Sequence, residues 1–153
     1  MDNLKIIPAP LTESVTEELI GMSADWEAEE SCWGYRKNGI ADLEGRTVYL
    51  AKAGDMTVGY LFGIEEASKT DNSFVKKGEK YFELEELYVK PAFRSRGVGR
   101  TLFAFAEEAL RDRVRYIMLG TATKNSKAIL HFYLDEVGME FWSARLVKKI
   151  GIN

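Results

Sequence analysis

The sequence is poor in the residues that cross-link a chain or hold a metal, with one cysteine and one histidine among 153 residues. Cys32 by itself excludes a disulfide within the chain, as is usual for proteins of a reducing cytoplasm. A structural zinc site needs about four Cys or His ligands, more than this chain has. We therefore expect a cytoplasmic protein without a metal centre.

Long apolar runs and a strong charge of either sign are also lacking. No apolar run approaches the roughly 18–20 residues that span a bilayer, and residues 1–5 do not resemble the start of a signal peptide. The net charge is −3, whereas nucleic-acid-binding domains usually carry a basic excess. Hydrophobic residues make up 46% and charged residues 29%, as in ordinary globular domains. These features predict a soluble protein that binds neither membranes nor nucleic acid.

The length fits one domain, and hydrophobic periodicity predicts alternating strands and helices along it. Strands are expected at residues 5–7, 47–53, 57–64, 81–89, 115–121 and 141–150, the last as one or two closing strands. Helices are expected at residues 14–26, within 27–45, from about 98, and at 126–136. The strand–helix–strand unit from about 81 to 121 requires a parallel crossover. The sequence thus predicts a mixed α/β domain whose largely antiparallel sheet contains a parallel pair.

Local patterns define some of these elements more closely. Ser14 and Glu17 have the spacing of a capping box at a helix start. The first helix presents an apolar face, formed by Val15, Leu19, Met22 and Trp26. The helix from about residue 98 presents a second one, formed by Val98, Leu102, Phe105, Ala106 and Ala109. A hairpin is expected where Gly54-Asp55-Met56 joins two strands.

The most informative segment covers residues 87–100, where a strand leads into a loop with Gly97 and Gly99 and then into a helix. The first turn of a helix leaves about four backbone N–H groups without intrahelical partners, and their partial positive charge favours an anion. Glycines let the backbone approach a diphosphate closely. Three guanidinium groups add full charges nearby: Arg94, Arg96 and Arg100. The segment therefore predicts a phosphate-bearing ligand.

Two common phosphate-binding motifs do not fit this segment. The sequence has no Walker A run, and a dinucleotide fingerprint starting at Gly97 would need glycine where Leu102 stands. The run Arg94-Ser95-Arg96-Gly97-Val98-Gly99 instead fits the pattern Arg/Gln-x-x-Gly-x-Gly/Ala. With the strand LEELYV before it, the run closely resembles the coenzyme-A-binding motif of the GNAT superfamily of N-acetyltransferases.

A second segment, Asn125 to Met139, resembles the Asn-x-x-Ala…Tyr…Gly-Phe stretch of the same family. It departs from the family pattern in two ways: the spacing from Tyr133 to Gly138 is one residue longer, and Met139 stands where Phe is usual. We expect the extra residue to disturb the helix end rather than the position of Tyr133. The resemblance implies a single GNAT domain over residues 1–153, with an acyl-CoA-binding core at 46–150 and a variable, acceptor-side segment at 1–45.

This resemblance implies direct transfer of an acetyl group from acetyl-CoA, as co-substrate, to a primary amine in a ternary complex. The amine is protonated at pH 7, so a base is needed. Strand alternation places Glu83, Glu85 and Leu87 on one face and Leu84, Glu86 and Tyr88 on the other. Similar spermidine/spermine acetyltransferases have a glutamate four residues before the last valine of the strand, which corresponds to Glu85. We expect Glu85 to be the base, through a water, with Glu83 as second candidate; solvated strand carboxylates are the alternative.

The family resemblance also selects Tyr133 as the acid that protonates the leaving thiolate, the alternative being an ordinary core aromatic. A backbone N–H at residues 87–89 is expected to bind the carbonyl oxygen, at a splayed or bulged part of the strand. Cofactor contacts are expected from the strand and the loop that follows it: Leu87, Tyr88, Val89, Arg94, Ser95, Arg96, Gly97, Val98, Gly99 and Arg100. Asn125 is expected to cap its helix or to contact the cofactor, capping being the first choice.

The acceptor amine is expected to meet residues 1–45. Carboxylates at Asp25, Glu27, Glu29 and Glu30 would attract a cation, although a solvated helix face explains them equally well. Candidates for lining the acceptor pocket are Trp26, Glu30, Trp33 and Tyr35, with core packing as the alternative. The stretch 141–149 loosely resembles the tail of the diamine acetyltransferases. These features favour a small-molecule, cationic amine.

Other interpretations stay open at this point. The acceptor can instead be a protein N-terminus or a lysine side chain, and a GNAT fold that has lost turnover can act as an acyl-CoA sensor. His131 as a base and Cys32 as a nucleophile are the least favoured roles. A lone histidine beside Leu130 and Phe132 is more often structural, and for Cys32 the family's usual route is direct attack and no histidine lies nearby in the sequence. The sequence neither supports nor excludes a homodimer.

Overall fold

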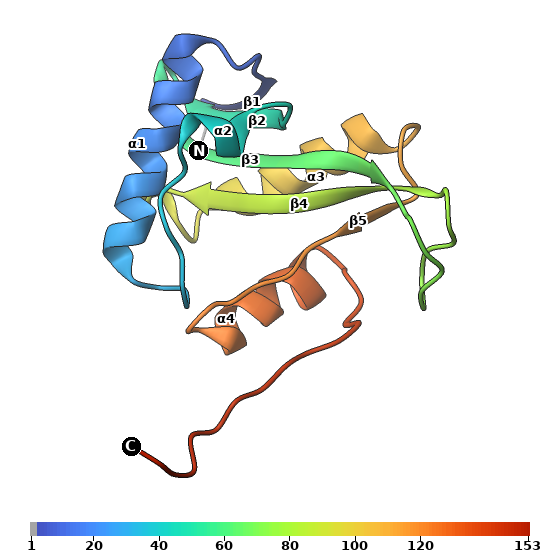
Figure 1. Cartoon of the computed structure of the whole chain (residues 1–153). Coiled ribbons are helices and arrows are strands. Elements are labelled where there is room, and N and C mark those ends of the chain that lie inside the picture. The colour runs from blue at the N-terminus through green and yellow to red at the C-terminus, as the bar shows by residue number, and fades with distance from the viewer. Residues whose placement is uncertain (1–2) are drawn as a thin grey trace.

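The computed structural model describes residues 3–153, which form a twisted five-stranded sheet with helices on both faces (Figure 1). The strands are β1 (Leu4–Pro8), β2 (Thr47–Ala53), β3 (Met56–Ala67), β4 (Lys80–Val89) and β5 (Tyr116–Met118). The helices are α1 (Glu13–Glu29), α2 (Ile40–Leu43), α3 (Val98–Leu110) and α4 (Ser126–Leu130). A 3₁₀ turn, η1 (Pro91–Phe93), precedes α3, and a π-helix, η2 (His131–Glu136), continues α4.

The strands lie in the order β1-β2-β3-β4-β5, so neighbours along the chain are neighbours in the sheet. All pairs are antiparallel except β4 and β5, which are parallel because α3 crosses between them. The predicted mixed α/β fold with one parallel pair is therefore confirmed. No helix among residues 3–153 has the length and apolar character needed to cross a membrane.

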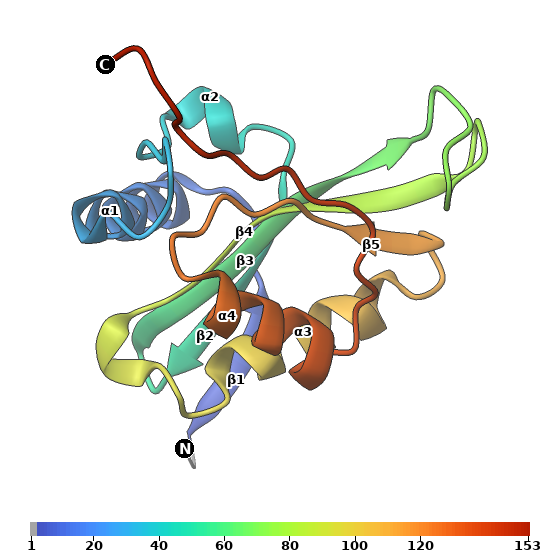
Figure 2. The ribbon, with the colours of Figure 1, turned by 90° about the horizontal axis from the view of Figure 1, so that it is seen from below.

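The sheet separates two apolar cores. Figure 2 shows α1 and α2 on one side of the sheet and α3 and α4 on the other. One face is covered by α1 and α2, and buried residues there include Leu19, Met22 and Tyr60. The other face is covered by α3 and α4, and buried residues there include Leu61 and Leu102. The apolar face predicted for α1 is confirmed, since its four residues all belong to the first core.

Two details of the helices differ from the prediction. Thr12, not Ser14, is the N-cap of α1, because its Oγ1 accepts a hydrogen bond from the backbone N–H of Val15 at 3.2 Å. In α3, Phe103 and Leu110 are buried, whereas Phe105 is only partly buried. The buried face of α3 is therefore rotated about the helix axis relative to the predicted face. Sequence periodicity fixes an apolar stripe to within about one residue, and packing against the sheet selects its centre.

A β-bulge interrupts the pairing of β3 with β4. Phe62 pairs with Glu86 and Gly63 pairs with Leu84, so Glu85 has no partner on β3. The extra residue reverses the alternation of side chains, and Leu84 lies in the α3 core while Tyr88 lies in the α1 core. The predicted common face for Leu84 and Tyr88 is therefore wrong, because simple alternation assumes an unbroken ladder.

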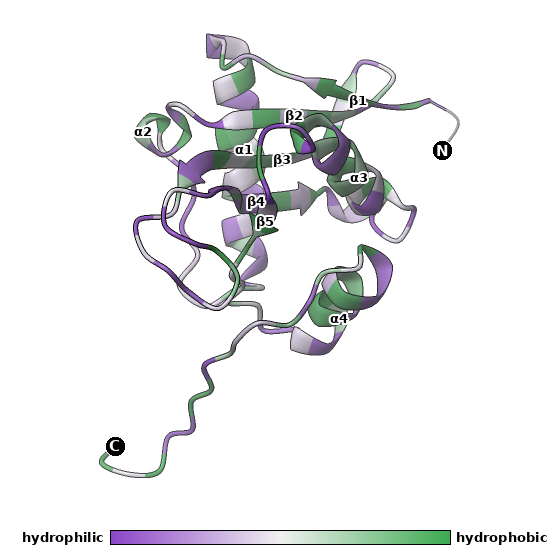
Figure 3. Cartoon of the chain, turned by 90° about the vertical axis from the view of Figure 1, so that its right-hand side faces the viewer, coloured by the Kyte–Doolittle hydropathy of each residue, from purple (hydrophilic) through white to green (hydrophobic). Residues whose placement is uncertain are grey.

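The closing strands predicted at residues 141–150 are absent: residues 140–153 form an extended tail with no assigned strand. The last backbone hydrogen bond before this tail runs from the N–H of Met139 to the C=O of Tyr133. The tail then leads away from the sheet (Figure 3). A strand requires a neighbour to bond with, and the tail pairs with no strand among residues 3–153.

Candidate functional site

The loop between η1 and α3 presents a group of unpaired backbone donors. Ser95 and Gly97 have positive φ angles of 60° and 81°, which turn the chain sharply before α3 begins. Within the described part of the chain, the backbone N–H groups of residues 95–100 have no backbone acceptor, and the first bond of the helix is Thr101 N–H to Gly97 C=O at 3.0 Å. Such a run of free donors at a helix N-terminus is a ready anion site.

A cleft of about 450 Å³ begins at these donors. Its walls come from the end of β4 (Leu84, Glu85, Leu87–Val89), from the loop and first turn of α3 (Phe93–Ser95 and Gly97–Arg100), and from the α4 side (Leu119–Thr121, Thr123, Asn125, Ile129, Phe132, Tyr133 and Glu136), with Trp26, Glu29, Ser31 and Cys32 closing one end. Most residues expected to touch the cofactor thus line one cleft. Arg96 is the exception, because its guanidinium lies over the ring of Phe93 at 5.8 Å.

The cleft exists because β4 and β5 separate. They pair only where Tyr81, Phe82 and Glu83 meet Tyr116, Ile117 and Met118, and the bulge at Glu85 follows at once. Beyond it, residues 87–89 of β4 have no strand partner on the β5 side, and this edge of β4 becomes a wall of the cleft. The bulged and splayed strand implied by the family resemblance is present.

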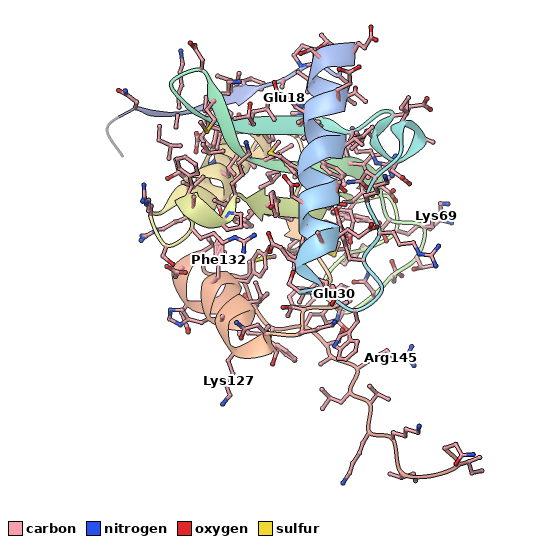
Figure 4. The ribbon with its side chains drawn as sticks, turned by 90° about the vertical axis from the view of Figure 1, so that its left-hand side faces the viewer. Glu18, Glu30, Lys69, Lys127, Phe132 and Arg145 are labelled. Atoms are coloured by element: carbon pink, nitrogen blue, oxygen red, sulfur yellow. The ribbon has the colours of Figure 1, made fainter. Side chains whose placement is uncertain are left out.

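Gly99 lies where three elements come closest at the cleft floor. A Cβ at this position would lie 3.4 Å from the Phe132 ring and 3.5 Å from Leu87 Cδ2. Figure 4 shows Phe132 pointing from η2 toward the body of the protein. The second glycine therefore lets α3 approach β4 and η2, whereas Gly97 supplies the left-handed turn.

Tyr133 projects into the cleft from the π-helix. Backbone hydrogen bonds from Val137 to Phe132 and from Met139 to Tyr133 accommodate one residue more than an α-helix would. The extra residue noticed in the sequence thus widens the helix end, as expected. Burial, with a smaller effect of Cys32, raises the pKa of Tyr133 to about 12, so the phenol holds its proton across the neutral range.

The loops on the two sides of the cleft meet above it. Trp33 N–H donates to the Ala122 carbonyl at 2.8 Å, and Lys124 N–H donates to the Ser31 carbonyl at 2.9 Å. This short antiparallel bridge joins the end of α1 to the start of α4. Asn125 caps α4, since its Oδ1 accepts from the Ala128 N–H at 3.4 Å, the first choice made from the sequence.

A family model described as "Acetyltransferase (GNAT) family" matches residues 12–139, most of the chain. The chain belongs to the GNAT acetyltransferase family. The match includes the donor loop, the bulged strand and Tyr133, and it ends where the tail begins.

Solved structures of similar fold lead to the same family. An aminoglycoside acetyltransferase (meta-AAC0020) from an uncultured soil metagenomic sample is 16% identical, with 98% of each chain covered and a TM-score of 0.70. A ribosomal-protein-alanine N-acetyltransferase from Brucella melitensis biovar Abortus 2308 is 11% identical, with 95% of this chain and 99% of that chain covered and a TM-score of 0.67. A predicted acetyltransferase with acetyl-CoA from Clostridium acetobutylicum is 14% identical, with 95% of this chain and 96% of that chain covered and a TM-score of 0.66. At these identities the likeness concerns the fold alone. No relative was found among curated proteins.

In this GNAT protein, the Arg94 side chain is already engaged. Its Nη2 contacts both carboxylate oxygens of Glu29 at 2.8 and 2.9 Å, and its Nε donates to the Val89 carbonyl at 2.8 Å. Tyr88 donates its hydroxyl to the same Glu29 at 3.0 Å and lies under the guanidinium. Glu29, one of four carboxylates noted in the sequence, thus holds Arg94 against the cleft wall.

The two candidate bases have different surroundings. Arg46 contacts both oxygens of Glu85, with Nε–Oε1 at 2.7 Å and Nη2–Oε2 at 3.1 Å, and Glu85 lines the cleft. Glu83 does not line the cleft. Burial, with the neighbouring carboxylates of Glu85 and Glu66, raises the pKa of Glu83 above its ordinary value. Glu85 therefore lies at the cleft, whereas the carboxylate with the raised pKa, that of Glu83, does not line it.

A partly buried carboxylate that the sequence did not single out, Glu86, lies on the α1 face of β4. Its Oε1 accepts hydrogen bonds from the hydroxyls of Tyr35 at 2.9 Å and Tyr60 at 2.8 Å, and the Asn38 amide donates to both its oxygens at 3.0 Å. Burial outweighs these bonds and raises the pKa of Glu86. The strand has three closely spaced glutamates, Glu83, Glu85 and Glu86, and the sequence gave no signal to distinguish Glu86, because the bulge decides which face of the sheet it occupies.

The four residues proposed to line the acceptor pocket have separate environments. Trp26 lines the cleft and stacks on Tyr35 at 4.4 Å. Tyr35 itself is bound to Glu86 and Ser23, away from the cleft lining. Trp33 is 70% exposed under Lys124, and Glu30, at the exposed end of α1 in Figure 4, is not part of the cleft wall. The structure therefore places only Trp26 at the cleft.

Proposed function

We propose that this GNAT protein transfers an acetyl group from acetyl-CoA to the primary amine of a small cationic acceptor. The observation that carries the proposal is the set of free backbone donors at residues 95–100, opening onto a cleft that continues to the bulge of β4. The donors suit the diphosphate of coenzyme A, and the exposed edge of residues 87–89 suits the amide groups of its pantetheine arm.

The residues that line the cleft can supply each of the proton transfers and contacts that acetyl transfer needs. Glu85 takes a proton from the ammonium group, through a water, and the freed nitrogen lone pair attacks the thioester carbon. A backbone N–H at the splayed part of β4 binds the oxygen as it becomes negative. The C–S bond then breaks and Tyr133 gives its proton to the leaving thiolate, while the acetylated nitrogen passes its second proton to the tyrosinate, which leaves a neutral amide and a free thiol. The pKa of Tyr133, raised to about 12, keeps that proton available at neutral pH.

Acidic side chains near the bulge support a cationic acceptor. Three carboxylates lie close together there: Glu66 of β3, and Glu83 and Glu85 of β4. Glu66 and Glu85 are near enough to Glu83 to contribute to its raised pKa. Of the three, Glu85 has Arg46 as a cationic partner. An ammonium group drawn to this place would be steered toward the thioester end of the cleft. Two of the four carboxylates predicted at the end of α1 are less suitable, since Glu27 accepts a hydrogen bond from the Lys37 N–H and Glu29 binds Arg94.

Calorimetry with acetyl-CoA tests the first half of the proposal. Gly97→Glu puts a carboxylate among the donors and should abolish binding. Gly78→Glu is the matched control, because Gly78 also has a positive φ, 89°, and open space for a Cβ, but lies in the β3–β4 loop far from the cleft lining. Equal affinity in the wild type and in Gly97→Glu would refute the phosphate site.

A thiol-release assay tests the second half, with spermidine, an aminoglycoside and a lysine-containing peptide as acceptors. Release with the small polyamines or aminoglycosides is expected; release with the peptide alone would indicate a protein acceptor. Tight binding of acetyl-CoA without release for any amine would indicate a sensor module. Comparing Glu85→Gln with Glu83→Gln assigns the base, and the variant with the larger loss of kcat identifies it.

A further inference from the structure

The α1–α2 segment (residues 31–39) depends on side chains for its position. Apart from the single bridge at Cys32, no helix or strand is assigned to it. Figure 1 shows the segment returning beside α1 before α2 begins. The backbone N–H of Asn38 donates to Ser23 Oγ of α1 at 2.8 Å, and a second N–H of the segment also bonds to a side chain of α1. A segment held in this way stays in place only while its few partners remain.

Two side chains of the α1–α2 segment end on one carboxylate of β4, that of Glu86. The Tyr35 hydroxyl donates to Oε1 at 2.9 Å, and the Asn38 amide donates to both oxygens at 3.0 Å. Tyr60 of β3 donates to Oε1 at 2.8 Å. A carboxylate accepts hydrogen bonds on both oxygens, whereas an amide accepts on only one. Glutamate at this position therefore suits the task of joining the segment to the sheet.

The surroundings of these bonds are buried, which makes their loss costly. Ser23 is 0% exposed and Asn38 is 9% exposed, although both are polar. Ser23 Oγ accepts from the Asn38 amide at 3.1 Å and lies 2.7 Å from the Tyr35 hydroxyl. A buried donor left without its acceptor costs more than a hydrogen bond lost at the surface. Without the carboxylate of Glu86, the segment would thus be released from the sheet rather than stay with unpaired donors.

The same contacts extend to the cleft wall. The ring of Tyr35 stacks on Trp26, with 4.4 Å between the ring centroids, and Trp26 lines the cleft. Cys32, at the start of the α1–α2 segment, also lines the cleft and is near enough to Tyr133 to affect the pKa of its phenol. Glu86 is not among the residues that line the cleft. It contacts the reaction site only through other residues.

We propose that Glu86 is a positioning residue, which holds the α1–α2 segment against β4. Through this segment it keeps Trp26 and Cys32 in place as the cleft wall that meets the acceptor amine. The assignment of this wall to the acceptor rests on the proposed function. The backbone donors at residues 95–100 belong to another part of the cleft, so acetyl-CoA binding should not depend on Glu86.

Hydrogen exchange of the backbone amides of residues 33–38 tests whether Glu86 holds the segment. Glu86→Gln puts an amide donor opposite the Asn38 amide. Exchange should become about five- to thirtyfold faster, the factor expected when one or two hydrogen bonds are lost from a local opening equilibrium. Glu79→Gln is the matched control, since Glu79 accepts from the Lys76 N–H at 2.8 Å in the β3–β4 loop. Unchanged exchange in Glu86→Gln, or equal acceleration in β2, would overturn the proposal.

A second variant restores the hydrogen bonds with the two groups exchanged. Asn38→Asp combined with Glu86→Gln places a carboxylate on the segment and an amide on β4, so that a donor faces an acceptor again. Most of the protection of residues 33–38 should return. Asn38→Asp alone brings two carboxylates together and should accelerate exchange. If the double variant exchanges no more slowly than either single variant, the direct bond is not what holds the segment.

Steady-state kinetics with spermidine separates positioning from a general structural role. Glu86→Gln should raise the KM for spermidine several-fold, because the amine meets its wall only when the segment is in place. The dissociation constant of acetyl-CoA should stay within about twofold, since the backbone donors are intact. A lower kcat at unchanged KM, without rescue by Asn38→Asp, would mean only less folded enzyme and would refute positioning. If the wild type acetylates no amine, the proposed function fails, and the exchange measurements still decide whether Glu86 holds the segment.

Discussion

Removal of the Tyr133 hydroxyl should slow turnover without destabilising the protein. The pKa of this phenol is raised by burial and by Cys32, with no hydrogen bond contributing, and no protein group within residues 3–153 accepts from or donates to it. The oxygen therefore has no role in stability that its loss would expose. Any large effect of Tyr133→Phe must then come from chemistry or from ligand contact.

The size of each effect follows from this environment. A substitution that breaks no hydrogen bond and leaves the ring in place should change the free energy of unfolding by less than about 0.5 kcal/mol. Loss of a general acid typically costs about 10²–10⁴ in rate, or roughly 2.7–5.4 kcal/mol in the barrier. The affinity for acetyl-CoA should stay within about twofold, since binding rests on the backbone donors.

Three measurements check this prediction: kcat in the thiol-release assay, the dissociation constant of acetyl-CoA by calorimetry, and urea unfolding. Tyr49→Phe is the matched control, because Tyr49 belongs to the same apolar core but does not line the cleft. The control should leave all three unchanged. Unaltered kcat in Tyr133→Phe would remove the acid role. Raising the pH gives a second check: because the folded-state pKa is about 12 against 10.0, the wild type should lose stability between pH 10 and 12, and the variant should lose less.

Three further predictions concern the residues around the cleft. Glu86→Gln should flatten the pH dependence of stability, because burial raises the folded-state pKa of Glu86 above 4.5. The stability that the protonated Glu86 contributes is full below that pH and is lost as the pH rises. Equal slopes of unfolding free energy against pH for wild type and variant, from urea unfolding at pH 4.5–8, would contradict this. Gly63→Ala should cost about 3 kcal/mol, because its Cβ would lie 2.1 Å from the Glu83 carbonyl oxygen beside the bulge, whereas Gly120→Ala meets nothing within 4 Å and should be neutral in the same assay. Glu29→Gln should tighten acetyl-CoA binding about two- to fivefold in calorimetry, by freeing Arg94 from an exposed ion pair; unchanged or weaker affinity would show that Arg94 does not reach the ligand.

Long, strongly patterned elements were predictable because their signals are local. The apolar stripe of α1, the hairpin of β2 and β3 and the parallel crossover around α3 all rest on periodicity and on turn residues within a short window. The extra residue after Tyr133 was likewise visible as a spacing, and it appears as a π-helix. Faces depend on exact register, however, and one unpaired residue at Glu85 was enough to reverse them.

Contacts between distant segments could not be inferred from the sequence. Arg94 looked like a free phosphate ligand, but Glu29, 65 residues away, holds it in the structure. Glu86 looked like its two neighbouring glutamates, but Tyr35, Asn38 and Tyr60 surround it. Such pairings depend on which faces of the sheet the helices and loops cover, and local sequence patterns do not indicate this.

The sequence by itself determined the family, the order of elements and the position of the free backbone donors, because glycine spacing at a helix start fixes where such donors remain. Only the tertiary structure decided which carboxylates face the cleft, how Tyr133 keeps its proton, and where the apolar tail leaves the sheet. Each of these depends on burial and on distances between segments far apart in the chain, which exist only once the sheet has formed.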